Sequence, residues 1–182
     1  VMPYFPSING MLNGDYHLMM NADHQISVAS DMEVQQMVYE DSPVGNIAVD
    51  FVYLQREDDT HAVDATLMRD GMEIGTLQGE YRTGVKAVNA EVVLTSLPLL
   101  MVNGFIPDHL FGFHGYAEGS LTIKGTLNRP QVNGEILLDS AGMVSEPYGI
   151  RLRFDDDPVR IIDSKLLLEN FSMYAVRSEE NQ

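Results

Sequence analysis

The stretch GSLTIKGTLNRPQVNGEILLDSAG, residues 119–142, alternates apolar and polar side chains in the manner of two β-strands. The apolar residues of its first half fall on one side of an extended chain: Leu121, Ile123 and Leu127. A turn is expected at residues 128–130, because proline fixes its own φ and has no N–H to donate to a sheet. The alternation then restarts with Val132, Gly134, Ile136 and Leu138. Two antiparallel strands with one apolar face are therefore predicted.

Glycine interrupts this alternation more often than an ordinary core strand tolerates. Gly125 weakens a strand, since glycine loses more backbone freedom on folding than other residues do. Its expected use is a bulge, a bend or the close approach of another group to the backbone. The prediction that follows is a strongly curved sheet.

Strand signals follow one another along the rest of the chain with turn signals between them, which is typical of an all-β protein. The predicted strands are residues 10–20, 25–34, 44–55, 60–69, 72–82, 85–95, 115–127, 131–139, 148–154, 158–162 and 165–176. Asp70 and Gly71 predict a two-residue hairpin turn, because both central residues of such a turn need a positive φ.

One short helix is the exception, predicted near residues 97–103. Ser96 is a candidate N-cap, Pro98 would lie in the first turn, and Asn103 with Gly104 can end the helix. The segment is apolar on most sides, which is typical of a helix inserted into or across a core. We expect a single all-β segment over residues 1–182, with residues 96–112 as the place where a subdivision would fall.

Composition argues against several classes of protein. The 182 residues include 11 Lys and Arg against 27 Asp and Glu, a net charge of −16 that would repel a phosphate backbone, so a nucleic-acid partner is not expected. The absence of cysteine rules out disulfides and thiolate catalysis. No run reaches the roughly 18 consecutive apolar residues of a membrane-spanning helix.

Motifs that would indicate an enzyme are also missing from the sequence. There is no nucleophile elbow, no phosphate-binding glycine loop and no H-E-x-x-H pair. The run at residues 155–157 is acidic but lacks the spacing of a calcium loop, so a solvated turn before Pro158 is the better interpretation. Two carboxylates brought together for glycoside hydrolysis stay open as an alternative, although nothing singles out a pair. We expect no catalytic residue, no metal and no cofactor.

Residues 105–174 carry three sequence elements in a fixed order. They are FIPD at residues 105–108, the pattern G-x-L-x-I-x-G-T-x-x-x-P-x-x-x-G-x-I-x-L from Gly119, and IIDSKL at residues 161–166. This ordered set resembles the repeat-rich region of the TamB-like proteins of the AsmA-like family. The upstream stretch DGMEIGTLQGEY, residues 70–81, is similar to the same family more loosely.

The resemblance implies a fold, a function and a location. The fold is a long, bent β-sheet, or β-taco, whose concave face forms a hydrophobic groove. The function is the conduction of phospholipids between the inner and outer membranes, together with support of outer-membrane biogenesis alongside a TamA-type outer-membrane barrel. The location is the periplasm of a Gram-negative bacterium, with the chain as a segment of a longer protein that is anchored in the inner membrane by a part absent here.

Period-two alternation predicts which residues would line such a groove. The expected ligands of the groove are phospholipid acyl chains. They are Val88, Val92, Leu94, Leu121, Ile123, Leu127, Val132, Ile136, Leu138, Ile150, Leu152 and Phe154. The competing interpretation of these residues is a sealed core. The alternative function is that of a protein-binding module, which receives an incoming strand by β-augmentation during outer-membrane protein assembly.

Overall fold

The computed structural model describes residues 7–39, 42–105, 110–169 and 171–176, and they form one open antiparallel sheet with a single short helix. The strands are β1 (Ile8–Met20), β2 (Ile26–Tyr39), β3 (Ser42–Gln55), β4 (Thr60–Arg69), β5 (Met72–Arg82), β6 (Ala87–Pro98), β7 (Gly112–Thr126), β8 (Arg129–Ser145), β9 (Ile150–Phe154), β10 (Val159–Ile162), β11 (Lys165–Leu167) and β12 (Met173–Ala175). The helix η1 (Leu99–Phe105) is of the 3-10 type. The all-β, open-sheet fold class is thus confirmed.

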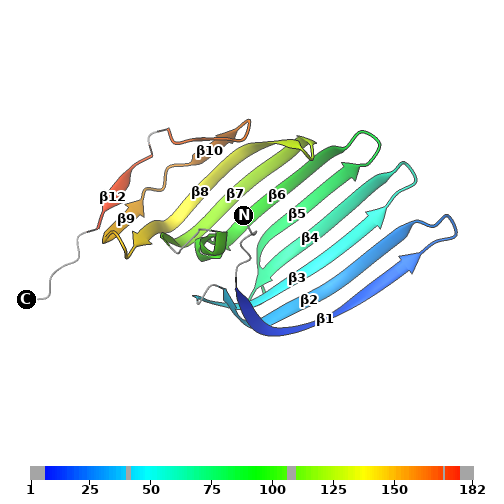
Figure 1. Ribbon diagram of the computed structural model, residues 1–182, viewed down its shortest axis with the longest axis horizontal. Helices are drawn as coiled ribbons and strands as arrows, with labels where there is room; N and C mark the ends of the chain where they lie inside the picture. The colour runs from blue at the N-terminus through cyan, green and yellow to red at the C-terminus, as the bar shows by residue number, and fades with distance from the viewer. Residues whose placement is uncertain (1–6, 40–41, 106–109, 170, 177–182) are drawn as a thin grey trace, which may run out of the picture.

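The strands from β1 to β8 lie side by side in chain order, as Figure 1 shows. The helix η1 lies in the connection between β6 and β7, and these two strands form one ladder from Ala87 opposite Thr126 to Pro98 opposite Tyr116. Beyond β8 the sheet divides, because one part of β8 pairs with β10 and another part pairs with β9. The sheet does not close into a barrel.

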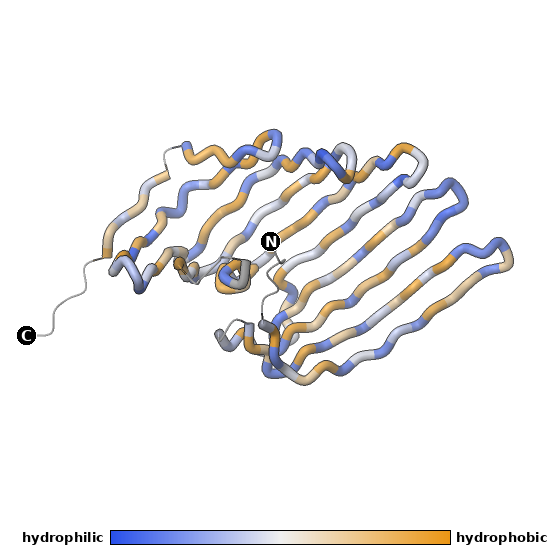
Figure 2. Tube along the Cα trace, in the orientation of Figure 1, coloured by the Kyte–Doolittle hydropathy of each residue, from blue (hydrophilic) through white to orange (hydrophobic). Residues whose placement is uncertain are grey.

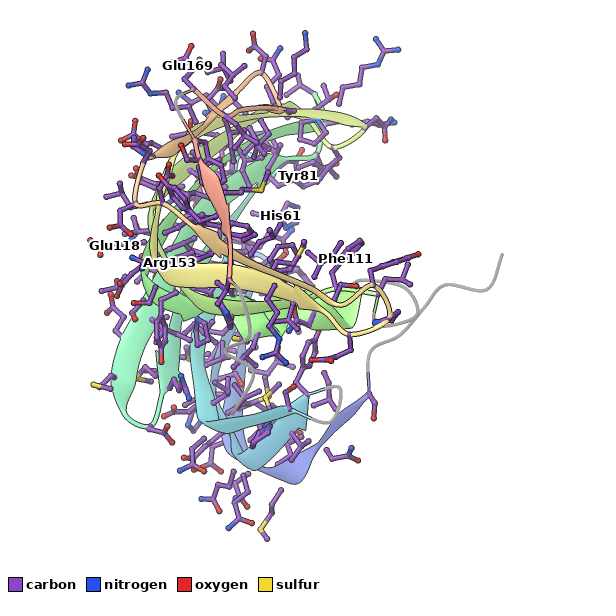
Figure 3. All side chains as sticks on the ribbon, turned by 90° about the vertical axis from the view of Figure 1, so that its left-hand side faces the viewer. His61, Tyr81, Phe111, Glu118, Arg153 and Glu169 are labelled. Atoms are coloured by element: carbon purple, nitrogen blue, oxygen red, sulfur yellow. The ribbon has the colours of Figure 1, made fainter. Side chains whose placement is uncertain are left out.

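The sheet is strongly bent, and its section in Figure 3 is an open curve. His61 and Tyr81 lie inside this curve, whereas Glu118 lies outside it. Directly paired residues of neighbouring strands point to the same side of a sheet, so these labelled side chains identify the two faces for the strands between them. We call the inner side the concave face and the outer side the convex face.

The hairpin predicted at Asp70 and Gly71 is confirmed. Strand β4 ends at Arg69 and β5 begins at Met72, and the two residues between them have φ values of 50° and 80°. Asp70 also accepts a hydrogen bond at Oδ1 from the backbone N–H of Asn46 at 2.9 Å, which ties this turn to β3. The turn thus has the positive φ values that a two-residue hairpin needs. Its hydrogen bond to Asn46 also holds the adjacent part of β3 in place.

The predicted helix starts two residues too early. Leu97 and Pro98 belong to β6, where they pair with Ala117 and Tyr116 of β7. Residues 97–98 form backbone pairs with β7, so they are not available for the first turn of a helix. Ser96 therefore does not act as the N-cap. The helix then begins at Leu99.

Two other boundaries differ from the prediction. The turn between β7 and β8 falls at residues 127–128, and Pro130 is already paired with Gly125 inside the β8 ladder. Proline has no N–H to donate to a ladder, but it is tolerated at this position. The reason is that β10 pairs with β8 only from Gly134 to Ile136, so β10 does not pair with Pro130. The strand predicted at residues 165–176 is two short strands, β11 and β12.

A compact core lies at one end of the concave face. Its buried members are Met37, Tyr39, Val44, Ile47 and Ile74, and Leu97, Leu100 and Met101 pack against them. The last two belong to η1, so the helix covers the end of the sheet where the hairpin of β2 and β3 meets the hairpin of β4 and β5. Burial of these side chains stabilises that end, at about 25 cal/mol per Å² of apolar surface.

Glycine allows β7 and β8 to approach each other closely. A Cβ at Gly119 would overlap the carbonyl oxygen of Glu135, and a Cβ at Gly134 would overlap the carbonyl oxygen of Ser120. Both glycines also have positive φ, at 149° and 157°. The repeated glycines of this hairpin are therefore a requirement of backbone packing between two curved strands.

Candidate functional site: the concave apolar face

A continuous row of apolar side chains crosses the concave face from β3 to β7. The pairing register places Phe51 opposite Ala65, Ala65 opposite Leu77, Leu77 opposite Val92 and Val92 opposite Leu121. Each of these residues is half-buried. Side chains that are neither sealed in a core nor fully solvated form a surface on which an apolar ligand can lie.

The convex face of the same strands is largely polar, although Val52, Leu54 and Val93 also lie on it. Its polar residues include Asp64, Thr66, Thr76, Gln78, Glu80, Asn89, Glu91, Ser120, Thr122 and Lys124. Figure 2 shows the resulting alternation of hydrophilic and hydrophobic positions along the strands. A sheet with one wet face and one dry face needs something to cover the dry one, and the described residues supply η1 at one end but no second sheet.

The concave face contains an apolar hollow of ≈ 140 Å³ next to the core. Among the residues that line it are Val49, Ala65, Leu67, Leu77, Val92 and Leu94. No charged side chain lines this hollow. The hollow offers no polar recognition and would accept a hydrocarbon group.

The opposite end of the concave face, near the turn between β3 and β4, carries a polar aromatic cluster. The Tyr53 hydroxyl lies 2.5 Å from Nδ1 of His61, and the two rings stack with centroids 5.8 Å apart. Tyr81 on β5 pairs directly with His61, and their ring centroids are 6.2 Å apart. Figure 3 shows His61 and Tyr81 on the inner side of the curve. The concave face thus has a buried apolar end and an amphipathic end.

Most of the predicted groove residues are brought together by the ladders of β6, β7 and β8. Val92 pairs with Leu121, Ile123 pairs with Val132, and Leu138 pairs with Ala117, which is 3% exposed. The other members on these strands are placed on the same face by the same register: Val88 beside Tyr81, Leu94 beside Gly119, and Ile136 beside Gly119.

The remaining predicted residues lie elsewhere. Leu127 is not on a strand: it lies in the turn after β7 and is 58% exposed. Ile150 is the first residue of β9, opposite Ser145, and is 39% exposed. Leu152 pairs with Met143.

The last predicted residue, Phe154, belongs to an aromatic cluster near the end of the chain. Its ring centroid is 6.2 Å from that of Phe113 and 5.6 Å from that of Phe171. Both contacts are tilted, an arrangement that aromatic pairs favour. These rings pack together around β9, away from the row that runs from β3 to β7.

Sequence reasoning missed the part of the concave face that β3, β4 and β5 supply. The alternation in IAVDFVYLQ, residues 47–55, is the signal that was available, because it places Val49, Phe51 and Tyr53 on one side. Alternation does not reveal that His61 and Tyr81 become neighbours of Tyr53. That juxtaposition depends on the register of three strands.

The described residues provide neither a metal site nor a membrane-spanning helix. They contain no group of three or more His, Asp or Glu side chains placed to hold a metal ion. No helix within them has the length and apolar character needed to cross a membrane.

Comparison of the chain with protein-family models, curated proteins and solved structures finds no match.

Proposed function

We propose that this chain is a segment of a conduit that shelters phospholipid acyl chains on its concave face, between the inner and outer membranes of a Gram-negative envelope. The observation that carries the proposal is the row from Phe51 to Leu121: apolar, half-buried and uncovered by a second sheet in the described part of the chain. The resemblance to TamB-like proteins supports the periplasmic location and the role in outer-membrane biogenesis.

The dimensions of the concave face suit an acyl chain. Six residue steps separate His61 from Leu67 on β4, which is about 20 Å at about 3.3 Å per residue. One leaflet of a bilayer offers about 15 Å of hydrocarbon, half of a core of about 30 Å. An acyl chain can therefore lie along β4 between the aromatic cluster and η1.

The driving force in this proposal is transfer from water, which needs no reactive group. A fully buried methylene contributes about 0.8 kcal/mol, and a methylene on a half-open face contributes less. The binding of successive methylenes is additive and non-directional, so a chain can slide along the face. A passive conduit requires this behaviour.

Two adjacent valines of β6 allow a matched test. Val92 lies on the concave row opposite Leu121, whereas the side chain of Val93, which is 38% exposed, points to the convex face. Native mass spectrometry with lipid extraction would measure phospholipid that co-purifies with the wild type, with Val92→Glu and with Val93→Glu. The proposal expects bound lipid in the wild type and in Val93→Glu, and its loss in Val92→Glu.

Absence of lipid from all three proteins, persisting after incubation with liposomes, would overturn the proposal. Equal lipid content in the two variants would also overturn it, because a ligand on the concave face must sense the Val92 position. Far-UV circular dichroism of both variants checks that the sheet is intact.

A second candidate function, β-augmentation, is favoured by one observation at the edge of the sheet. Strand β1 is 13 residues long, pairs only with β2 among the described strands, and is exposed at every residue. A long unpaired edge offers backbone donors and acceptors to an incoming strand. This function would bind an extended peptide without loss on Val92→Glu, which distinguishes it from the conduit.

A further inference from the structure

On β3, β4 and β5, the concave face carries four hydrogen-bonding side chains at one end. Tyr53, Gln55, His61 and Tyr81 come from β3, β4 and β5 and lie toward the turns that join β3 to β4 and β5 to β6. The next concave positions along these strands are Phe51, Val63 and Gly79, and beyond them lie the apolar hollow and η1. An amphiphile that lies along these strands would place its polar head at the first end and its hydrocarbon chain at the second.

The contact between Tyr53 and His61 occupies Nδ1 of the imidazole and leaves Nε2 for a ligand. When the tyrosine hydroxyl donates to Nδ1, the proton of the neutral imidazole is on Nε2. Nε2 is then an N–H donor, and none of the described residues accepts a hydrogen bond from it. The Tyr81 hydroxyl likewise has no partner among the described residues. In this tautomer, two donors remain beside each other on the concave face.

Acidic side chains flank these donors. Glu57, Asp58 and Asp59 are exposed in the turn that leads into β4, within four residues of His61. The nearby Arg56 is paired with Glu80 at 2.6 Å, and the charge of Arg82 acts on Asp58, so Glu57 and Asp59 carry most of the acidic character of this turn. Since the whole chain carries a net charge of −16, a ligand with a net negative charge would be repelled, while one that also carries an ammonium group would not.

We propose that this end of the concave face holds the head group of a zwitterionic phospholipid. His61 Nε2 and the Tyr81 hydroxyl donate to phosphate or ester oxygens, and the carboxylates of residues 57–59 attract the ammonium group. Tyr53 is a positioning residue, which sets the tautomer and the orientation of the His61 ring. The acyl chain then runs toward η1. This inference rests on the proposed function and deepens it by assigning the head-group class and the orientation of the lipid.

The test uses lysophosphatidylethanolamine below its micelle concentration and, as an apolar probe without a head group, diphenylhexatriene. Titration of histidine-labelled protein by NMR should shift the His61 imidazole signals with the lysolipid. His61→Gln and Tyr81→Phe should each weaken lysolipid binding about five-fold, the loss expected for one hydrogen bond, and leave diphenylhexatriene binding unchanged.

Tyr53→Phe is a test of the positioning role, because it keeps the ring and removes the hydroxyl. The imidazole nitrogen shifts should report a loss of the single tautomer, and lysolipid affinity should fall by a similar factor. Tyr16→Phe is the matched control, since Tyr16 lies on the same face but at the β1 edge, 77% exposed. It should change neither measurement.

Three results would overturn the inference. If lysolipid affinity is unchanged in His61→Gln and Tyr81→Phe and diphenylhexatriene still binds, the head-group site is wrong, whereas the proposed conduit is not contradicted. Equal affinity for lysophosphatidylglycerol would remove the assignment to a zwitterion. Failure of the wild type to bind both lysolipid and diphenylhexatriene would overturn the conduit and the head-group site together.

Discussion

Asp31 on β2 lies directly opposite Asp50 on β3, and the two carboxyl groups share a hydrogen bond on the convex face. This hydrogen bond, followed by desolvation and by the charge of Asp31, raises the pKa of Asp50 above its ordinary value of 3.8. Asp15 on β1 is in turn the direct partner of Asp31, so three carboxyl groups form a row across the first three strands. Like charges directly opposite each other destabilise a ladder.

This row predicts a dependence of stability on pH. Between pH 3.8 and the raised pKa of Asp50, the folded state binds more protons than the unfolded state, so stability falls as the pH rises through that window. Asp31→Asn removes the charge and supplies an amide donor to Asp50. The variant should unfold at a higher temperature than the wild type at pH 7, with a difference that narrows toward pH 4. Thermal melts across this range measure it.

Asp23→Asn is the control for that experiment, since Asp23 is exposed in the turn between β1 and β2 and its substitution changes the net charge equally. The difference in unfolding temperature between Asp23→Asn and the wild type should not narrow toward pH 4. A constant difference between Asp31→Asn and the wild type at every pH would contradict the role of the carboxyl pair.

Curvature of the sheet predicts the cost of filling a glycine on β7. Gly119→Ala would force a Cβ onto the carbonyl oxygen of Glu135, and overpacking of this kind costs about 1–3 kcal/mol. Gly84→Ala, in the turn between β5 and β6, meets open space and should be neutral or stabilising by up to about 1 kcal/mol. Urea unfolding of the two variants gives both values. Equal stabilities would show that the close approach of β7 and β8 is not required.

The core at the η1 end predicts a contrast between two valines of β3. Val44 is fully buried in the core with Ile47 and Ile74, so Val44→Ala should lower the free energy of unfolding by about 2 kcal/mol. Val52 is 51% exposed, and Val52→Ala should change it by no more than about 0.5 kcal/mol. Chemical denaturation followed by circular dichroism provides the comparison. A Val52 effect as large as that of Val44 would place the core elsewhere.

The exposed edge of β1 predicts concentration-dependent self-association. Leu12 is 66% exposed on this edge. Leu12→Lys should shift sedimentation toward the monomer, because a charge on an edge strand opposes pairing with another sheet. Met72→Lys is the control, since Met72 is 70% exposed at the start of β5, a strand that is paired on both sides. Sedimentation velocity at several concentrations checks the result. A wild type that is monomeric throughout would contradict it.

Local chemistry explains which elements were predictable. The strand pair on either side of residues 127–128 and the hairpin at Asp70 and Gly71 follow from alternation and turn residues close together in sequence. The helix start at residue 97 was wrong because Leu97 is held by Ala117, a partner 20 residues away. Likewise, the division of β8 between two partner strands leaves no local signal.

The sequence by itself determined that the chain forms amphipathic strands with one apolar side, because alternation along an extended backbone is a local property. Only the tertiary structure decided that Phe51, Leu77 and Leu121 share one row. It also decided that Tyr53, His61 and Tyr81 meet at the end of that row. The physical reason is register: which residues of separate strands become neighbours is set by backbone pairing and glycine-permitted curvature across the whole sheet.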